Sequence, residues 1–251
     1  AGVDKPDPTG KFEGSSVYAY VWPTSLNSGE IGFDVDRGIV ALAVTFHPDC
    51  ECPYTLTLPA LQKFAVARKL DVTTDLRMPA ELERRMMHLD PDFKTLTYGD
   101  VGNRRGAEIP RMAKKDFVVF YAGLRSTQPP HKPLVYAMVG IFFVDEVVLA
   151  SQVNPSRWNE NAHTRKSSHG AHDVIIRARS GSSGRLRRYI PIGEYRDRAY
   201  RVRHDLLDAW GGLTVNNGYI QRSAVPPRFL EPRKFLQWLE SQDIELLQSN
   251  W

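Results

Sequence analysis

Two apolar runs joined by a proline-rich segment constrain the fold of this chain more than any other part of its sequence. The first run, Phe117 to Tyr121 (FVVFY), consists of β-branched and aromatic residues and is too short for a typical helix. The second, Leu134 to Val144 (LVYAMVGIFFV), contains Gly140, which predicts a bulge or a close backbone approach. The segment from Ser126 to Pro133 contains three prolines, which cannot donate ladder hydrogen bonds. The pattern predicts two neighbouring antiparallel strands joined by a loop.

Shorter patterns predict the other elements. Strands are expected at residues 17–22, 39–46, 173–178 and 186–192, and helices at 57–68, 79–89, 204–210 and 232–247. The polar segments 90–106 and 154–172 are expected to be loops, and loops are where ligands often bind. These elements indicate a single α+β domain over residues 1–251, with a mainly antiparallel sheet. Its core is expected over about 1–195, with helical decoration over about 200–251.

Charge is distributed unevenly along the chain. Residues 1–150 contain 17 Lys and Arg against 19 Asp and Glu, whereas residues 151–251 contain 16 against 10. Nine arginines, no lysine and only two acids lie from Arg177 to Arg203. The planar guanidinium group suits phosphates and base edges, so this pattern favours contact with a nucleic acid. The alternative is a solvated surface that is partly paired with the acidic first half.

The sequence also limits the environment of the protein. No apolar run reaches the ~18 residues that a membrane-spanning helix needs, so no membrane contact is predicted. The N-terminal segment lacks the charged and apolar regions of a secretory signal. Cys50 and Cys52 are too close for an ordinary disulfide, which favours a reducing, cytoplasmic location.

Two groups of residues have spacings that can ligate a metal. His47, Cys50 and Cys52 form H-x-x-C-x-C, but no second cysteine pair follows to complete a tetrahedral zinc site. A second group of histidines, at 163, 169 and 172, lies in a segment for which a polar loop is the favoured interpretation. No metal and no cofactor are therefore predicted. The chain also lacks a G-x-S-x-G elbow, a P-loop and a dinucleotide fingerprint.

Several blocks of the sequence together resemble a known family. The strand pair around Gly140 is similar to the barrel core of the PUA, ASCH, EVE and YTH superfamily. The blocks GVDK, DPDFKTLTYGD, FVVFYAGL, NENAHTR, GYIQRS and PRFL resemble the nucleotide modification associated domain, type 3, from Gly2 to Leu230. The resemblance implies a PUA/EVE-like, mainly antiparallel β-barrel with peripheral helices. It also implies an association with systems that make, read or restrict modified nucleobases.

A protein that reads an extruded base needs flat apolar walls and a few fixed polar groups. The candidates for the walls are Tyr98, Tyr121 and Trp158, although each taken singly is more often a core residue. The candidates for the base edge are Asp4, Lys5, Asp100, Asn161 and His163. The candidates for phosphate contacts are Arg104, Arg105, Arg165, Arg177, Arg179 and Arg222.

The leading hypothesis is a nucleic-acid binding protein that recognises a modified or extruded nucleobase in an aromatic pocket, without catalysis. The alternative is an enzyme that modifies or processes nucleotides in the same pocket, with His163, Asp100 and Asp4 as acid–base groups. A third hypothesis is a module whose arginines bind an acidic protein. The sequence leaves open DNA against RNA, the modification and the oligomeric state.

Overall fold

The computed structural model describes residues 17–20, 43–46, 87–88, 90–103, 106–124, 135–166, 169–220 and 226–249. Side chains are described from Asp90 onward, Leu124 excepted. No helix in these ranges is long and apolar enough to cross a membrane.

Strand β6 (Val135–Leu149) organises the main sheet. It pairs antiparallel with β5 (Phe117–Leu124), so the predicted strand pair is confirmed. Phe142 of β6 packs against two rings from other segments, Phe93 and Phe120. The three rings contact one another edge to face, with centroids 4.8 to 5.7 Å apart. A Cβ at Gly140 would lie 2.5 Å from the Phe93 ring, and the register with β8 shifts at this glycine. The prediction of a bulge or a close approach at Gly140 is therefore confirmed.

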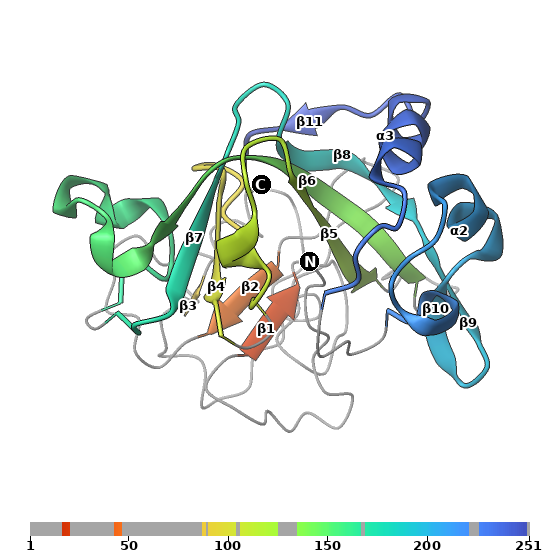
Figure 1. Ribbon diagram of the computed structural model, residues 1–251, viewed down its shortest axis with the longest axis horizontal. Coiled ribbons are helices and arrows are strands. Elements are labelled where there is room, and N and C mark those ends of the chain that lie inside the picture. The colour runs from red at the N-terminus through yellow and green to blue at the C-terminus, as the bar shows by residue number, and fades with distance from the viewer. Residues whose placement is uncertain are drawn as a thin grey trace, which may run out of the picture.

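The other strands of the sheet extend from β6 in both directions. β7 (Asp173–Ala178) and β8 (Gly184–Pro191) pair with β6, β4 (Thr97–Val101) pairs with β7, and β11 (Leu246–Leu247) pairs with β8. All these pairings are antiparallel, which confirms the predicted mainly antiparallel α+β class. Among the described strands, the end strands β4 and β11 do not pair with each other, and no closed barrel is found. Figure 1 shows β6 crossing the molecule, with β4 and β7 near one end and β8 nearer the other.

Three short strands form a separate antiparallel sheet: β1 (Val17–Tyr20), β2 (Ala43–Phe46) and β3 (Met87–His88). β1 and β2 fall within the predicted strands. The helix expected at 79–89 is wrong at its end, because residues 87 and 88 pair with β2. The helix expected at 57–68 lies outside the described residues.

The last part of the described chain contains the hairpin of β9 (Gly193–Arg196) and β10 (Ala199–Val202), followed by two α-helices (Figure 1). Helix α2 (His204–Trp210) has its predicted bounds and ends at Gly211, whose φ of 74° suits glycine. Helix α3 (Pro232–Glu240) begins where predicted. Its predicted extension to residue 247 is wrong, because residues 246 and 247 pair with β8 instead.

Short 3-10 helices connect these elements: η3 (Ile109–Arg111), η4 (Ala150–Gln152), η5 (Pro155–Glu160) and η6 (Asn216–Gly218). The loop expected at 90–106 is wrong for residues 97–101, which form β4. Five consecutive residues of this segment pair with β7, from Thr97 opposite Arg177 to Val101 opposite Asp173. The backbone of β4 thereby satisfies its hydrogen bonds despite a polar, glycine-containing sequence.

Candidate functional site

Strand β4 separates two groups of side chains, because consecutive residues of a strand point to opposite faces. Tyr98 packs edge-on against Phe120, with ring centroids 5.3 Å apart, and borders an open cleft. Gly99 faces the other way, where a Cβ would lie 2.4 Å from the His163 ring and 2.7 Å from Asn161 Oδ1. Only glycine allows these two side chains to lie so close to the strand.

A buried group of polar residues, here called the polar cluster, lies on the Gly99 side of β4. Its members are Asp90, Thr97, Asn161, His163, Lys166 and Asp173. Asn161 is fully buried at its centre. Its amide nitrogen donates to Asp90 Oδ1 at 3.1 Å and to Thr97 Oγ1 at 3.2 Å, and its Oδ1 accepts from the His163 backbone N–H at 2.8 Å. Both N–H groups of this amide therefore donate a hydrogen bond, and its oxygen accepts one.

The imidazole of His163 lies between two carboxylates. Its Nε2 is 3.6 Å from Asp90 Oδ2, and its Nδ1 is 3.5 Å from Asp173 Oδ1. Lys166 Nζ lies 3.3 Å from His163 Nδ1 and 3.2 Å from Asp173 Oδ2. The contact of Nδ1 with the Lys166 ammonium group, which can only donate, favours a proton on Nε2, whereas the hydrogen bond of His163 with the Asp173 carboxylate favours a proton on Nδ1.

The pKa values of the titratable groups in the polar cluster are shifted in different directions. Burial lowers the pKa of His163, which favours the neutral imidazole. Burial raises the pKa of Asp90, although hydrogen bonds from Gly99 and Asn161 oppose this. Burial also opposes ionisation of Asp173, but its contacts with His163 and Lys166 lower its pKa overall. Carboxyl groups with opposite pKa shifts around one imidazole are typical of acid–base sites.

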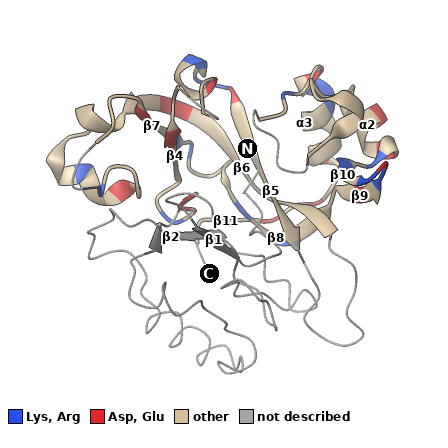
Figure 2. Ribbon diagram, turned by 90° about the horizontal axis from the view of Figure 1, so that it is seen from below, with Lys and Arg blue, Asp and Glu red and all other residues tan. Residues whose placement is uncertain are grey.

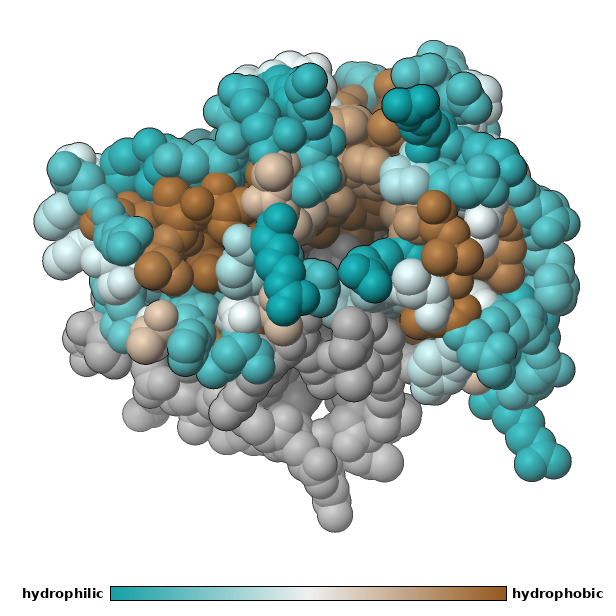
Figure 3. Space-filling model, viewed as in Figure 1, coloured by the Kyte–Doolittle hydropathy of each residue, from teal (hydrophilic) through white to brown (hydrophobic). Residues whose placement is uncertain are grey.

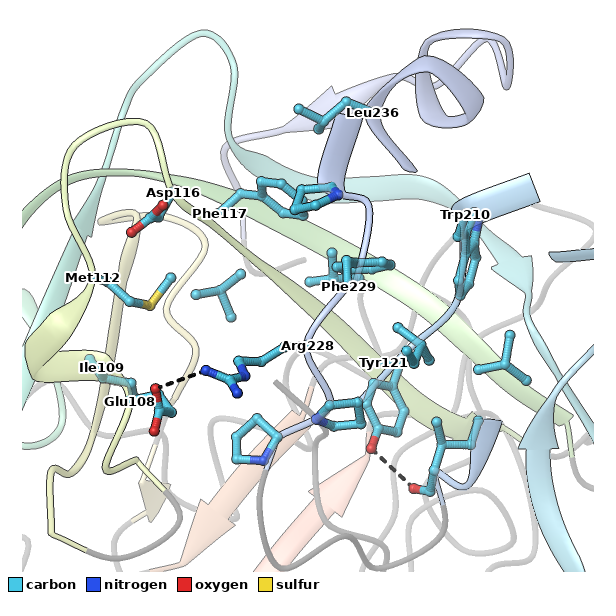
Figure 4. A pocket seen from close by; sticks show the side chains of 18 of the residues that line it. Glu108, Ile109, Met112, Asp116, Phe117, Tyr121, Trp210, Arg228, Phe229 and Leu236 are labelled. Carbon is cyan, nitrogen blue, oxygen red and sulfur yellow. Dashed lines mark hydrogen bonds and ion pairs between the residues drawn. The ribbon is translucent and has the colours of Figure 1, made fainter. Parts of the chain in front are cut away.

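On the Tyr98 side of β4, a cleft of about 470 Å³ opens between η3 and the segment that joins α2 to α3. Figure 3 shows a hollow with hydrophobic residues inside and hydrophilic residues around it. Strand β5 contributes Phe117, Val119 and Tyr121 to the lining, and Trp210 and Phe229 come from the opposite side (Figure 4). A volume of this size is typical of sites that bind small molecules.

Charged side chains stand at the edge of the cleft. Glu108 Oε1 accepts a hydrogen bond from Arg111 Nη1 at 3.0 Å, and Glu108 Oε2 lies 3.5 Å from Arg228 Nη1. The second contact joins the η3 side to the segment that carries Phe229 (Figure 4). Deeper in the cleft, the Tyr121 hydroxyl donates to the carbonyl of Ile220 at 3.0 Å. The Tyr121 hydroxyl is thus already bonded within the protein, and its ring is part of the apolar wall.

The structure brings some of the predicted base-binding residues together and separates others. Tyr98 and Tyr121 line the same cleft, and the Tyr98 hydroxyl donates to Asp100 Oδ2 at 3.1 Å. Asn161 and His163 lie in the polar cluster on the opposite face of β4. Trp158 lies on η5, outside the cleft lining, and is 44% exposed. The structure therefore places the predicted residues in two sites and one surface position.

The described arginines on the predicted phosphate list have different environments. Arg165 is buried, and its Nη1 donates to the carbonyl of Asn159 at 2.8 Å. Arg177 is held by carboxylates from two elements, Glu160 at 2.6 Å and Glu146 at 2.7 Å. Arg179 is exposed. The remaining predicted positions, Asp4, Lys5, Arg104, Arg105 and Arg222, lie outside the described residues.

The metal candidates do not form a site in the described part of the chain. No group of three or more His, Cys, Asp or Glu residues there has the arrangement of a metal centre. The three histidines of the second candidate group diverge: His163 joins the polar cluster, His169 Nε2 contacts the carbonyl of Thr164 at 2.9 Å, and His172 is exposed. Residues 47, 50 and 52 lie outside the described residues.

Several residues of both sites were not singled out from the sequence. Asp90 and Lys166 of the polar cluster were missed, and Asp173 was predicted only as the first residue of a strand. Glu108, Arg228 and Phe229 of the cleft were also missed. A signal existed for some of them, because Asp90 begins the DPDFKTLTYGD block and PRFL contains Arg228 and Phe229. The described blocks DPDFKTLTYGD, NENAHTR and PRFL thus contribute residues on the two sides of β4.

Comparison with protein families identifies one match. The model of the family described as nucleotide modification associated domain 3 matches residues 56–213, more than half of the chain. The match includes β4, the polar cluster and the β5 side of the cleft. No curated protein and no solved structure gives a significant match. The chain therefore belongs to the nucleotide modification associated domain 3 family.

Proposed function

We propose that the protein binds a nucleobase, extruded from DNA or RNA, in the aromatic cleft, and that it acts as a reader of modified bases. The observation that carries this proposal is the composition of the cleft. Rings from β4, β5, α2 and the segment before α3 line a cleft of about 470 Å³, and arginines stand at its edge. The PUA-like arrangement implied by the sequence resemblance belongs to the same proposal.

The physical reason is the match between this cleft and the two halves of a nucleotide. A base has two apolar faces, and stacking on aromatic side chains contributes about 1–3 kcal/mol per base. Phe117, Tyr121 and Phe229 offer rings for these faces. The phosphates next to an extruded base stay outside the cleft, where Arg111 and Arg228 are already positioned by Glu108. The chain belongs to a family described as nucleotide modification associated, and this description supports a modified base as the ligand.

Filling the cleft tests the proposal. Val119→Trp places an indole in the lining contributed by β5, where the base is expected to bind. The probes are short fluorescein-labelled DNA and RNA oligonucleotides that contain N6-methyladenine, 5-methylcytosine, 5-hydroxymethylcytosine or the unmodified base. We expect the wild type to bind one modified probe about tenfold more tightly than its unmodified counterpart, and Val119→Trp to lose this preference.

The matched control is Val215→Trp, which adds the same ring at a partly exposed position outside the cleft lining. It should keep the base preference of the wild type. Urea unfolding of both variants establishes that each is folded. The proposal fails if the wild type shows no preference among the probes, or if a folded Val119→Trp variant retains it.

The polar cluster favours a second candidate function, acid–base chemistry on a nucleotide or a nucleobase. The observation is the His163 imidazole between Asp90 and Asp173, which have opposite pKa shifts. In such a site one nitrogen of the neutral imidazole accepts a proton and the other donates one. This site is distinct from the cleft because it lies on the other face of β4.

Mass spectrometry of nucleotides and oligonucleotides incubated with the protein separates the two functions. An enzyme of this kind converts at least one of them, and His163→Gln abolishes the conversion while the affinity for the probe stays near that of the wild type. The control is His172→Gln, which changes an exposed histidine of the same segment. Absence of any conversion by the wild type excludes the second candidate for the compounds used and leaves the reader function.

A further inference from the structure

The β9–β10 hairpin rises directly from the wall of the cleft. Ile192, just before β9, and Val202, the last residue of β10, both line the cleft. Tyr195 on the hairpin is 64% exposed. Its ring rests edge-on against Tyr200, with centroids 5.2 Å apart. A large aromatic surface is therefore held in solvent beside the proposed base site.

The turn of the hairpin presents an arginine in an unfavourable backbone conformation. Asp197 and Arg198 have φ values of 50° and 62°, both in the left-handed region. A two-residue turn with positive φ at both positions matches the twist of a hairpin, and glycine is the favoured residue at its second position. Arginine stands there instead, and its side chain is exposed. Local folding preference does not explain this choice of residue.

Arg198 also differs from the other arginines of the hairpin in its contacts. Arg196 pairs with Glu194 at 2.9 Å, and Arg201 Nε lies 3.8 Å from Asp197. Within the described residues Arg198 makes no ion pair or side-chain hydrogen bond. The hairpin, residues 193–202, contains three arginines against two acids, and Figure 2 shows basic residues on both strands. The hairpin therefore has an excess positive charge, and Arg198 carries part of it at the tip.

We propose that the hairpin docks the nucleic-acid strand that flanks the base held in the cleft. Tyr195 stacks on a neighbouring base, and Arg198 contacts a backbone phosphate. This inference rests on the proposed function. Tyr195 is three residues beyond Ile192, roughly 10 Å of extended chain, which corresponds to about three nucleotides of a stacked strand. A ring with an adjacent guanidinium group is how proteins bind single strands without sequence preference.

Arg198→Gly is the most informative variant, because it separates folding from binding. Glycine adopts a φ of 62° without strain, so we expect the thermal midpoint of this variant to equal or exceed that of the wild type. Its affinity for a fluorescein-labelled single-stranded oligothymidylate should fall several-fold in an anisotropy titration. The slope of log affinity against log salt should flatten by about 0.7, the value of one phosphate contact on a single strand.

Tyr195→Ala and Tyr195→Phe test the stacking role. Alanine removes the ring and should weaken binding to the same probe about tenfold, whereas phenylalanine keeps the ring and should restore wild-type affinity. Arg188→Ala is the matched control for charge. Arg188 lies on β8, is exposed, and makes no ion pair or side-chain hydrogen bond within the described residues. Equal losses for Arg188→Ala and Arg198→Gly would overturn a specific role for the hairpin.

The outcomes also separate this inference from the proposed function. Unchanged binding by folded Tyr195→Ala and Arg198→Gly variants overturns the hairpin inference, even if Val119→Trp still loses its base preference. Reduced binding by the hairpin variants together with an unaffected Val119→Trp variant supports strand docking and removes the cleft as the base site. Absence of oligonucleotide binding by the wild type overturns both, as expected of a module that binds acidic proteins.

Discussion

The two faces of β4 show opposite ways of using side chains. On the Gly99 side, charged and polar groups are buried and contact one another, as Asn161, His163 and Asp173 do. On the Tyr98 side, the interior of the cleft is apolar and the charged groups stand at its edge. A satisfied polar network fixes one arrangement of the chain. An apolar cleft, in contrast, offers binding free energy to a ligand that covers its surface. Stability should therefore depend on the first face, and affinity on the second.

Asn161→Ala should give the largest effect on stability. Removal of this amide leaves Asp90 Oδ1, Thr97 Oγ1 and the His163 N–H without one buried partner each. A buried hydrogen bond contributes about 1 kcal/mol, so the loss of three should lower the free energy of unfolding by about 3 kcal/mol in urea titrations. Asn159→Ala, at an exposed position of the same segment, should change it by less than about 0.5 kcal/mol. Similar values for the two variants would contradict the central place of Asn161.

Gly99→Ala should be the next most damaging change. The new methyl group would lie 2.4 Å from the His163 ring, so the segment that carries His163 must move away from β4. Overpacking of this kind typically costs about 1–3 kcal/mol, measurable as a lower urea midpoint. Gly181→Ala is the control, because its Cβ meets open space and only its φ of 79° is unfavourable. A Gly99→Ala variant that is as stable as Gly181→Ala would show that the contact relaxes easily.

The pH dependence of stability should identify the proton state of His163. Its folded pKa is lowered by burial, so the unfolded chain binds more protons as pH falls through about 6.5, and the free energy of unfolding decreases. Asp90 acts in the opposite direction, because its folded pKa is raised and the folded protein takes up the proton first. His163→Gln should therefore lose less stability than the wild type between about pH 7.5 and 5.5. Identical pH profiles would mean that folding does not shift the pKa of His163.

Glu108→Gln should have the smallest effect on folding and should increase binding at the other face. Its ion pairs with Arg111 and Arg228 are partly exposed, so their loss costs less than about 1 kcal/mol. Removal of the negative charge beside the two arginines increases the attraction of the cleft edge for phosphates, and the affinity for the oligonucleotide probe should rise up to about fivefold at low salt. Glu245→Gln, which breaks the exposed pair with Arg187, controls for net charge. Weaker binding by Glu108→Gln would indicate that the carboxylate itself contacts the base.

Parts of the fold were predictable because their signals are local. The apolar runs that form β5 and β6 and the glycines that end α2 act over a few neighbouring residues. Strand β4 was not predictable in the same way, because TYGDV is polar and contains a glycine that usually marks a loop. What stabilises this strand is its ladder with β7, a partner distant in the sequence. The β9–β10 hairpin was missed for a similar reason, since its short strands, GEYR and AYRV, contain few apolar residues.

The residue types of the candidate sites were easier to predict than the relative positions of their side chains. The sequence indicated that Tyr98 and Tyr121 belong to an aromatic site, and the structure places both in one cleft. It did not indicate that His163 lies on the other side of β4, because the direction of a side chain depends on register. The acidic partners of Arg177 were not predictable either. Glu146 and Glu160 come from a strand and a 3-10 helix that only the fold brings together.

Because both sites share β4, we expect the chain to be sensitive to changes in the length of this strand. Insertion or deletion of one residue within β4 would exchange its two faces, so the Tyr98 ring would point at His163 and the cleft would lose a wall. Substitutions at one face leave the other in place, whereas any such shift damages both at once. Residues of the two sites can therefore be substituted independently, whereas the number of residues in β4 must stay constant.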